Sequence, residues 1–283
     1  MHQSIGILHP GMMGIAVAQA MVNSGYEVVW VSAGRSEATR QRAKAAGLVE
    51  VSTLAELCAR TTAMVSVCPP HAAEAVADEV MAQGFQGLYL DANAISPQKS
   101  TRIGEKISQA GGHFVDGGII GLPPTRREQS WLYLSGPNAS EAAAFFAQGP
   151  LEVEVISPEI GKASALKMCF AAHTKGLSAL LSTIVGAAEM MGVWEDLERQ
   201  WSRHGSDFAA TTQQRVRNVA HTKAWRFAGE MEEMVETFAG IGLPAGFFAA
   251  AAEVYRRVGH FKDAPQAPAL GEVVEALGRE GDG

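Results

Sequence analysis

The sequence predicts an α/β N-terminal domain of Rossmann type with a mostly parallel sheet, followed by an all-α C-terminal domain. Up to about residue 156, short apolar runs alternate with helix-length segments, which is typical of βαβ units. After that point no strand pattern occurs, and apolar residues recur with helical periodicity. We therefore expect a Rossmann domain over 1–157, a helical substrate and dimerisation domain over 158–265, and a loosely ordered tail over 266–283.

Seven short apolar runs are the predicted strands, and their nearly continuous apolar character indicates that helices cover both faces of the sheet. These strands are Ser4–Leu8, Glu27–Val31, Ala63–Cys68, Gly87–Asp91, His113–Asp116, Trp131–Leu134 and Glu152–Ile156. The predicted helices between them are Met12–Asn23, Glu37–Ala46, His71–Gln83, Pro97–Ala110 and Ala139–Ala147.

The C-terminal half opens on a predicted helix start at Ser157-Pro158-Glu159. A capping hydroxyl is followed there by proline at the first helical position and then by an acid. No proline interrupts the pattern from there to about Met191, so one long helix is expected. The helices predicted after it are Glu195–His204, Asp207–His221, Lys223–Gly240 and Pro244–His260.

The overall composition narrows the class of protein. Hydrophobic residues make up 47% of the 283 residues, which is enough for a packed core, and the formal net charge is −7. Because nucleic acid and anionic membranes repel a net anion, general binding to either is not expected. Three scattered cysteines, Cys58, Cys68 and Cys169, form no C-x-x-C pair, so neither a metal site nor a disulfide framework is expected.

Two further features favour a cytoplasmic location. The N-terminus carries no basic segment followed by a long apolar stretch, so a secretory signal is not expected. The most apolar later stretch, 171–191, contains His173, Lys175 and Glu189, which favours a buried helix over a membrane span.

The first predicted strand leads into a turn of the kind that binds dinucleotides. The turn is His9-Pro10-Gly11-Met12-Met13-Gly14, with His9 at the place of the usual first glycine. Gly11 would let the backbone approach a pyrophosphate, and Gly14 would let the helix pack closely on the strand. The N–H groups at the helix start, including those of Met12 and Met13, favour negative charge. The alternative is a helix start with two structural glycines.

The end of the second predicted strand indicates which dinucleotide is bound. NAD-binding proteins place an acid there for the ribose diol, whereas NADP-binding proteins lack the acid and supply a cation. Here Ser32-Ala33-Gly34-Arg35-Ser36 follows the strand, with no acid before Glu37. Arg35 can bind a 2′-phosphate with two hydrogen bonds, and Ser36 can donate another. NADP is therefore expected rather than NAD; the alternative for Arg35 is a solvated loop residue.

Five segments, taken in order, resemble the β-hydroxyacid dehydrogenase superfamily, which includes 3-hydroxyisobutyrate and 6-phosphogluconate dehydrogenases and, more distantly, imine reductases. The resemblance is closest to a poorly characterised branch that has its own C-terminal helical domain, which the segment 223–244 resembles. The five segments are ILHPGMMG at 7–14, VSVCPP at 65–70, DANAISP at 91–97, FVDGGIIGLPP at 114–124 and GKASALKMC at 161–169.

The resemblance implies a cofactor loop at Cys68-Pro69-Pro70 and places Asn93 near the nicotinamide, where it would hydrogen-bond the carboxamide or the substrate. Asp91 is equally well explained as a strand-end carboxylate. The resemblance also implies that Gly121 belongs to a substrate loop. There the chain departs from the hydroxyacid enzymes, because Ile120-Gly121-Leu122 stands where they have a serine and two glycines.

Lys167 stands at the place of the family's catalytic lysine. Oxidation of a β-hydroxy acid removes a proton from the hydroxyl oxygen, so a cation or base beside that oxygen is required. In the reverse direction an ammonium group stabilises the developing alkoxide and then protonates it. The alternative is a lysine whose stem packs on the helix while its ammonium reaches solvent.

The family's usual asparagine four residues after this lysine is replaced by Ala171. On unbroken α-helical spacing, Thr174 shares the face of Lys167 and is expected to replace the asparagine, and Lys175 is expected to hold an anionic group of the substrate. Arg226 is expected to form an ion pair with Glu230, and Lys223 is expected to form one with Glu230 or Glu233. The resemblance further implies a homodimer formed through the C-terminal helices.

These observations predict an NADP-dependent oxidoreductase that acts on a small β-hydroxy acid, aldehyde or ketone, with Lys167 as proton donor and acceptor. An imine reductase-like enzyme is the first alternative, although imine reductases generally replace this lysine. A catalytically silent NADP-binding scaffold or sensor is the second, because the serine, glycine and asparagine partners are missing.

Overall fold

The computed structural model describes residues 4–279. The chain divides into two compact units, Met1–Met168 and Cys169–Gly283. The division falls inside the long helix, whereas the sequence suggested a boundary before it. The first turns of this helix pack on the sheet, as shown below, and therefore belong to the first unit.

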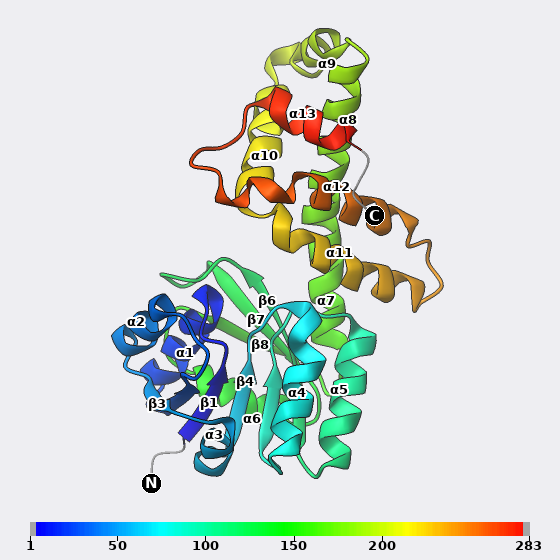
Figure 1. Cartoon of the computed structure of the whole chain (residues 1–283). Coiled ribbons are helices and arrows are strands. Elements are labelled where there is room, and N and C mark those ends of the chain that lie inside the picture. Colours follow the sequence, from blue (N-terminus) through cyan, green and yellow to red (C-terminus); the bar gives the residue numbers. More distant parts are fainter. Residues whose placement is uncertain (1–3, 280–283) are drawn as a thin grey trace. The chain divides into compact units, whose positions relative to one another are not determined.

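The first unit is built on one eight-stranded sheet in the order β3-β2-β1-β4-β5-β6-β7-β8 (Figure 1). Strands β1 to β6 are parallel to one another, β6 and β7 are antiparallel, and β8 is parallel to β7. The predicted mostly parallel Rossmann-type sheet is thus confirmed. The strands are β1 Ser4–Leu8, β2 Glu27–Val31, β3 Val49–Val51, β4 Ala63–Ser66, β5 Leu88–Asp91, β6 His113–Gly121, β7 Ser130–Ser135 and β8 Glu152–Ser157.

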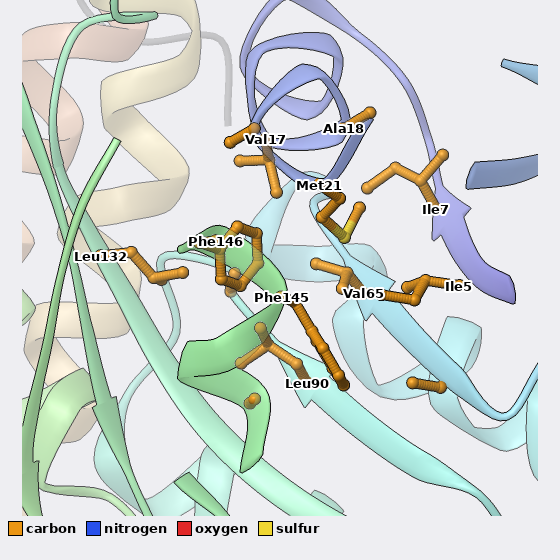
Figure 2. Close-up of a cluster of buried hydrophobic side chains, with 14 of the residues drawn as sticks. Ile5, Ile7, Val17, Ala18, Met21, Val65, Leu90, Leu132, Phe145 and Phe146 are labelled. Carbon is orange, nitrogen blue, oxygen red and sulfur yellow. The ribbon is translucent and has the colours of Figure 1, made fainter. Parts of the chain in front are cut away.

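Helices cover both faces of this sheet, and alternate residues of each strand point to opposite faces. One face packs against α1 Met12–Asn23, α2 Glu37–Ala45 and α6 Ala139–Ala143, and the other against α3 Leu54–Arg60, α4 Ala73–Ala82 and α5 Pro97–Gln109. Figure 2 shows Val17 and Met21 of α1 in one cluster with Ile5 and Val65 of the sheet. On the opposite side of β1 and β5, Leu8 and Tyr89 belong to the second core. This double cover explains the apolar strands in the sequence.

Side-chain caps fix where several of these helices begin. The hydroxyl oxygens of Ser36, Thr53 and Ser96 accept hydrogen bonds from backbone N–H groups in the first turns of α2, α3 and α5. Pro97 occupies the first helical position of α5, where its missing N–H leaves no bond unmade.

The structure corrects the sequence analysis at three places in this unit. The short strand β3 and helix α3 were not predicted, since three strand residues carry too little periodicity. Strand β6 continues to Gly121 rather than ending at Asp116. The long helix begins at Lys162 and not at Ser157-Pro158-Glu159, because Ser157 still belongs to β8 and pairs with Ser135.

The second unit is helical. The long helix continues into it, and a five-residue π-helical segment, Ala172–Gly176, separates α7 Lys162–Ala171 from α8 Leu177–Met190. The remaining helices are α9 Trp194–Trp201, α10 Phe208–Thr222, α11 Ala224–Ala239, α12 Gly246–Val258 and α13 Leu270–Gly278. The predicted all-α C-terminal region is therefore confirmed.

Helix α13 corrects the prediction of a loosely ordered tail over 266–283, as far as residue 279. Val273 and Ala276 lie one turn apart and are both buried. The Leu277 carbonyl accepts a 2.8 Å hydrogen bond from Arg257 of α12. Pro265 and Pro268 precede this helix, and Gly271 and Gly278 lie near its two ends.

The 29-residue helix Lys162–Met190 is long and apolar enough to cross a membrane by length and composition alone. In the structure 44% of an apolar 18-residue stretch of this helix is buried within the protein. A core helix of a globular protein passes the same test.

Candidate functional site

Four strands of the first unit end at one edge of the sheet, because β1, β2, β4 and β5 are parallel. Strand β1 lies between β2 and β4, so the chain adds β2 and β3 on one side of β1 and then crosses over to add β4 and β5 on the other. Such a switch in strand order creates a crevice at the carboxyl ends of the strands, where open α/β sheets bind ligands. The predicted dinucleotide loop lies at this edge.

The turn after β1 has the backbone that a dinucleotide loop requires. Gly11 precedes helix α1, and a Cβ placed on it would meet only the His9 carbonyl oxygen, at 4.0 Å. A Cβ on Gly14 would lie 2.5 Å from that same oxygen, so only glycine allows this close approach. The first N–H groups of α1, on Met12 and Met13, belong to a helix start that suits a phosphate.

His9 adopts a backbone conformation that explains why glycine is usual at its position. Its φ is 65°, in the left-handed region that non-glycine residues rarely occupy. The imidazole Nδ1 is buried and has no hydrogen-bond partner. Burial, and to a smaller extent the charge of Arg35, lowers the pKa of His9 to about 4, so the ring is neutral at pH 7.

A pocket of about 360 Å³ opens at this edge. Its volume lies within the range of about 300–1,000 Å³ that is usual for ligand sites. Arg35 lines it, and the Nε atom of Arg35 is buried without a hydrogen-bond partner. The pocket is lined by Ile7, Leu8, His9, Val31, Ala33, Arg35, Ser52, Thr53, Leu54, Val76, Glu79 and Val80.

Two other polar residues that follow β2, Arg40 and Ser36, already have partners within the protein. Arg40 donates to the Ser32 carbonyl at 3.0 Å and pairs with Glu50 at 3.1 Å. The Ser36 hydroxyl caps helix α2 and lies 3.1 Å from the Thr39 hydroxyl. Of Arg35 and Arg40, only Arg35 lines the pocket.

The Asn93 side chain links the ends of strands β4 and β5 by hydrogen bonds. Its side-chain N–H₂ group donates to the Ser66 hydroxyl at 3.1 Å and to the Asp91 carboxylate at 2.9 Å. Its Oδ1 atom accepts from the Cys68 backbone N–H at 2.5 Å. Both donors of the Asn93 amide are therefore engaged. Asn93 positions the loop Cys68-Pro69-Pro70, while its direct contact with cofactor or substrate stays a prediction.

The Cys68 thiol lies in the same loop and is protonated near neutral pH. Burial, with the nearby Asp91 carboxylate, raises its pKa to about 12. The Ser66 hydroxyl also lies 3.8 Å from its sulfur. Cys68 can therefore pack against a ligand but does not supply a thiolate.

Gly121, which was expected to belong to a substrate loop, lies in strand β6, which is paired with β7. This corrects the loop prediction for Gly121, which pairs with Ser130 and has φ 130°. A Cβ on Gly118 would lie 2.7 Å from the Ala163 carbonyl oxygen and 3.0 Å from the Lys167 Cβ. The absence of a side chain on Gly118 lets α7 approach the strand and brings Lys167, which is half-buried, onto β6.

A buried carboxylate that the sequence analysis did not single out holds this helix in place. Asp116 of β6 is 1% exposed, and one of its oxygens accepts from the Ser164 backbone N–H at 3.0 Å. It also accepts from three hydroxyls, on Ser100 at 2.8 Å, Ser135 at 2.8 Å and Ser164 at 2.5 Å. Asp116 thus ties α5, β7 and the first turn of α7 together, one turn before Lys167. The signal was present in the sequence as an acid inside the apolar run FVDGG.

The two predicted substrate residues in the helical unit are engaged locally. The Thr174 hydroxyl donates to its own helix, at the Phe170 carbonyl. Thr174 lies in the π-helical segment, so the unbroken α-helical spacing behind its prediction does not hold. Lys175 forms an ion pair with Glu230, and both side chains are 13% exposed. Glu230 therefore pairs with Lys175 rather than with Arg226 or Lys223.

Two families match most of the chain. Residues 4–144 match the NAD binding domain of 6-phosphogluconate dehydrogenase, and residues 188–258 match a domain of unknown function, DUF1932. An uncharacterized 28.5 kDa protein from Methanothermus fervidus is 30% identical over 164 residues, which are 58% of this chain and 62% of that protein. The chain spans about three-fifths of the length of the curated relatives it matches.

Solved structures share the fold. The conserved protein MTH1747 of unknown function, described as structurally similar to 3-hydroxyacid dehydrogenases, is 28% identical. Its TM-score is 0.64, over 90% of this chain and 97% of that one. The 3-hydroxyisobutyrate dehydrogenase of Mycobacterium tuberculosis has a TM-score of 0.70 at 15% identity, over 99% of this chain and 100% of that one.

Proposed function

Because the chain belongs to a poorly characterised branch of the β-hydroxyacid dehydrogenase superfamily, which joins this NAD-binding domain to a DUF1932 domain, we propose that it is an NADP-dependent oxidoreductase. The observation that carries the proposal is the pocket beside the dinucleotide loop, where a buried guanidinium nitrogen of Arg35 has no partner. A buried donor without a partner is costly, and an anionic ligand group would satisfy it.

The residues at this edge fit a nicotinamide dinucleotide phosphate. Gly11 and the N–H groups of Met12 and Met13 would hold the pyrophosphate, and Arg35 would hold the 2′-phosphate. Ser32, Ser36 and the loop Cys68-Pro69-Pro70 would line the cofactor. Bound NADP(H) would supply the two-electron chemistry of a dehydrogenase or reductase.

Cofactor choice is tested by replacing Arg35 with glutamate. Wild-type protein should bind NADPH more tightly than NADH, and Arg35→Glu should lower the NADPH preference by roughly 10- to 100-fold, because a charged hydrogen bond becomes a repulsion. Both affinities are measured by fluorescence titration. Arg40→Gln is the matched control, since Arg40 already pairs with Glu50 and the Ser32 carbonyl and should leave the preference nearly unchanged. Equal affinities of wild-type protein for NADPH and NADH would refute the role of Arg35.

Lys167 is the proposed proton donor and acceptor. Its ammonium would stabilise negative charge on a substrate oxygen during reduction and would then protonate it. During oxidation the lysine would accept the hydroxyl proton. The packing of α7 on Gly118 and the bonds from Asp116 support this role, because they fix the turn of helix that carries Lys167.

The proposed substrate is a small β-hydroxy acid, aldehyde or ketone. A panel of hydroxy acids, carbonyl compounds and imines, followed at the absorbance of reduced nicotinamide, defines the class. Turnover of imines alone would favour the imine reductase alternative, and NADPH binding without turnover of any compound would favour the silent scaffold.

We further propose a homodimer located in the cytoplasm. Large apolar side chains, Phe170, Leu177 and Leu180, are 38–45% exposed along the long helix, and a second copy of that helix would cover them. Light scattering coupled to size-exclusion chromatography should give twice the mass of one chain. The mass of a single chain at micromolar concentration would exclude the dimer.

A further inference from the structure

We propose that His9 and Arg35 together bind the 2′-phosphate of NADP, and that His9 takes up a proton as this phosphate binds. The inference rests on the proposed NADP-dependent function. It adds a second phosphate ligand and a link between cofactor binding and protonation.

The position of His9 is the first reason. The residue stands where a dinucleotide loop normally has glycine, in a left-handed conformation that favours glycine. A strained backbone retained at a ligand edge points to a use for the side chain. The imidazole Nδ1 atom is buried and forms no hydrogen bond with α1 or with the loop.

The second reason is that Arg35 lies in the same pocket as His9. His9 and Arg35 line the same pocket, and each presents a buried nitrogen that lacks a hydrogen-bond partner. Two such nitrogens from different segments, the turn after β1 and the loop after β2, match a ligand group with several acceptor oxygens. A phosphate monoester has three such oxygens and a charge close to −2 at pH 7.

The charges around His9 set the direction of the proton exchange. The charge of Arg35 opposes protonation of the ring. Glu79 of α4 is the other charged residue that lines the pocket, and a carboxylate favours a nearby imidazolium. The lining residues from β1, from the segment before α3 and from the start of α3 carry no charge: Ile7, Leu8, Ser52, Thr53 and Leu54. With the pKa lowered to about 4, the ring is neutral before the ligand binds. A dianionic phosphate neutralises the effect of Arg35 and stabilises the imidazolium, so its binding raises the pKa of His9.

The pH dependence of NADPH affinity distinguishes binding by His9 and Arg35 together from binding by Arg35 alone. A phosphate held only by Arg35 binds more tightly as the pH rises through about 6, where the phosphate loses its second proton. A phosphate that shares its site with protonated His9 binds less tightly as the pH rises through the raised pKa of the histidine. NADH lacks the 2′-phosphate and shows neither trend.

Calorimetric titration of the full chain at pH 7, repeated in buffers of different ionisation enthalpy, measures the protons taken up for each nucleotide bound. Wild-type protein should take up a large part of one proton for each NADPH that binds, and close to none for each NADH. His9→Gly restores the usual loop residue and relieves the positive φ, so the variant should fold. It should lose the uptake and weaken NADPH binding by roughly tenfold, with NADH binding little changed. His9→Asn, which tolerates the left-handed backbone but stays neutral, should also lose the uptake.

The outcomes distinguish failure of the His9 proposal from failure of the proposed NADP-dependent function. If both variants bind NADPH in preference to NADH and take up as many protons as the wild type, the role of His9 is wrong while the NADP function stands. If the wild-type protein binds neither nucleotide, or binds NADH as tightly as NADPH, the NADP function fails and the inference fails with it.

Discussion

Replacing Lys167 by methionine should lower kcat by about 10²- to 10⁴-fold, the usual contribution of a positioned acid or base. Methionine keeps an unbranched apolar chain as long as the carbon stem of lysine and removes the ammonium, so the packing of α7 on Gly118 should be preserved. The affinity for NADPH should change little, because Lys167 lies outside the dinucleotide loop. The measurement is steady-state turnover of the best compound from the substrate panel, with a parallel fluorescence titration of NADPH.

Lys162→Met is the matched control. Lys162 stands at the start of the same helix, is exposed, and pairs with Glu159 on the surface at 3.1 Å. Exposed pairs of this kind contribute little to stability, so both turnover and NADPH affinity should stay near wild-type values. Unchanged kcat in Lys167→Met would remove the lysine from the mechanism. An equal loss of kcat in both variants would show that the substitutions disturb helix α7, and would not support an acid–base role of Lys167.

Replacing Asp116 by alanine should destabilise the sheet unit by about 2–5 kcal/mol. The substitution leaves the Ser164 backbone N–H and the hydroxyls of Ser100 and Ser135 without their acceptor inside the protein. Each buried donor left unsatisfied costs about 1–3 kcal/mol, although hydroxyls recover part of this by rotating. Urea unfolding followed by circular dichroism measures the loss. Turnover should fall as well, because the first turn of α7 loses its attachment to β6.

Asp116→Asn tests whether the hydrogen bonds are responsible. One amide oxygen can still accept from the Ser164 N–H and the Ser135 hydroxyl, while the amide N–H₂ can donate to the hydroxyls of Ser100 and Ser164. This variant should therefore lose much less stability than Asp116→Ala. Equal losses would show that the negative charge of Asp116, rather than the geometry of its bonds, holds the helix.

The sheet was largely predictable because its strands are buried on both faces and appear in the sequence as apolar runs. Strands β1 and β2 match their predicted bounds, Ser4–Leu8 and Glu27–Val31. Strand β3 was missed because three residues give no readable period. The start of the long helix was placed too early because Ser157-Pro158-Glu159 carries every local signal for a helix start, while pairing of Ser157 with β7 prevails.

The site was predictable where chemistry depends on residue type along one segment. Gly14 and Arg35 were predicted from their positions after β1 and β2. In the structure Gly14 allows a close approach to the His9 carbonyl, and Arg35 has a buried nitrogen without a partner. The bonds of Asp116 join segments far apart in the chain, so no local pattern reveals them. The π-helical segment was equally hidden, since no proline or glycine pair marks it, and it removes the spacing on which the role of Thr174 depended.

The most direct test of the central claim is the distance between C4 of the nicotinamide and the Lys167 Nζ in a crystal structure of the NADP complex. A substrate carbon must lie within about 3.5 Å of C4 while its oxygen lies within about 3.2 Å of the ammonium. We therefore expect a separation of no more than about 7 Å, with the 2′-phosphate against Arg35. A nicotinamide whose C4 lies well beyond that distance from Lys167, or a dinucleotide bound away from Gly11 and Arg35, would contradict the account.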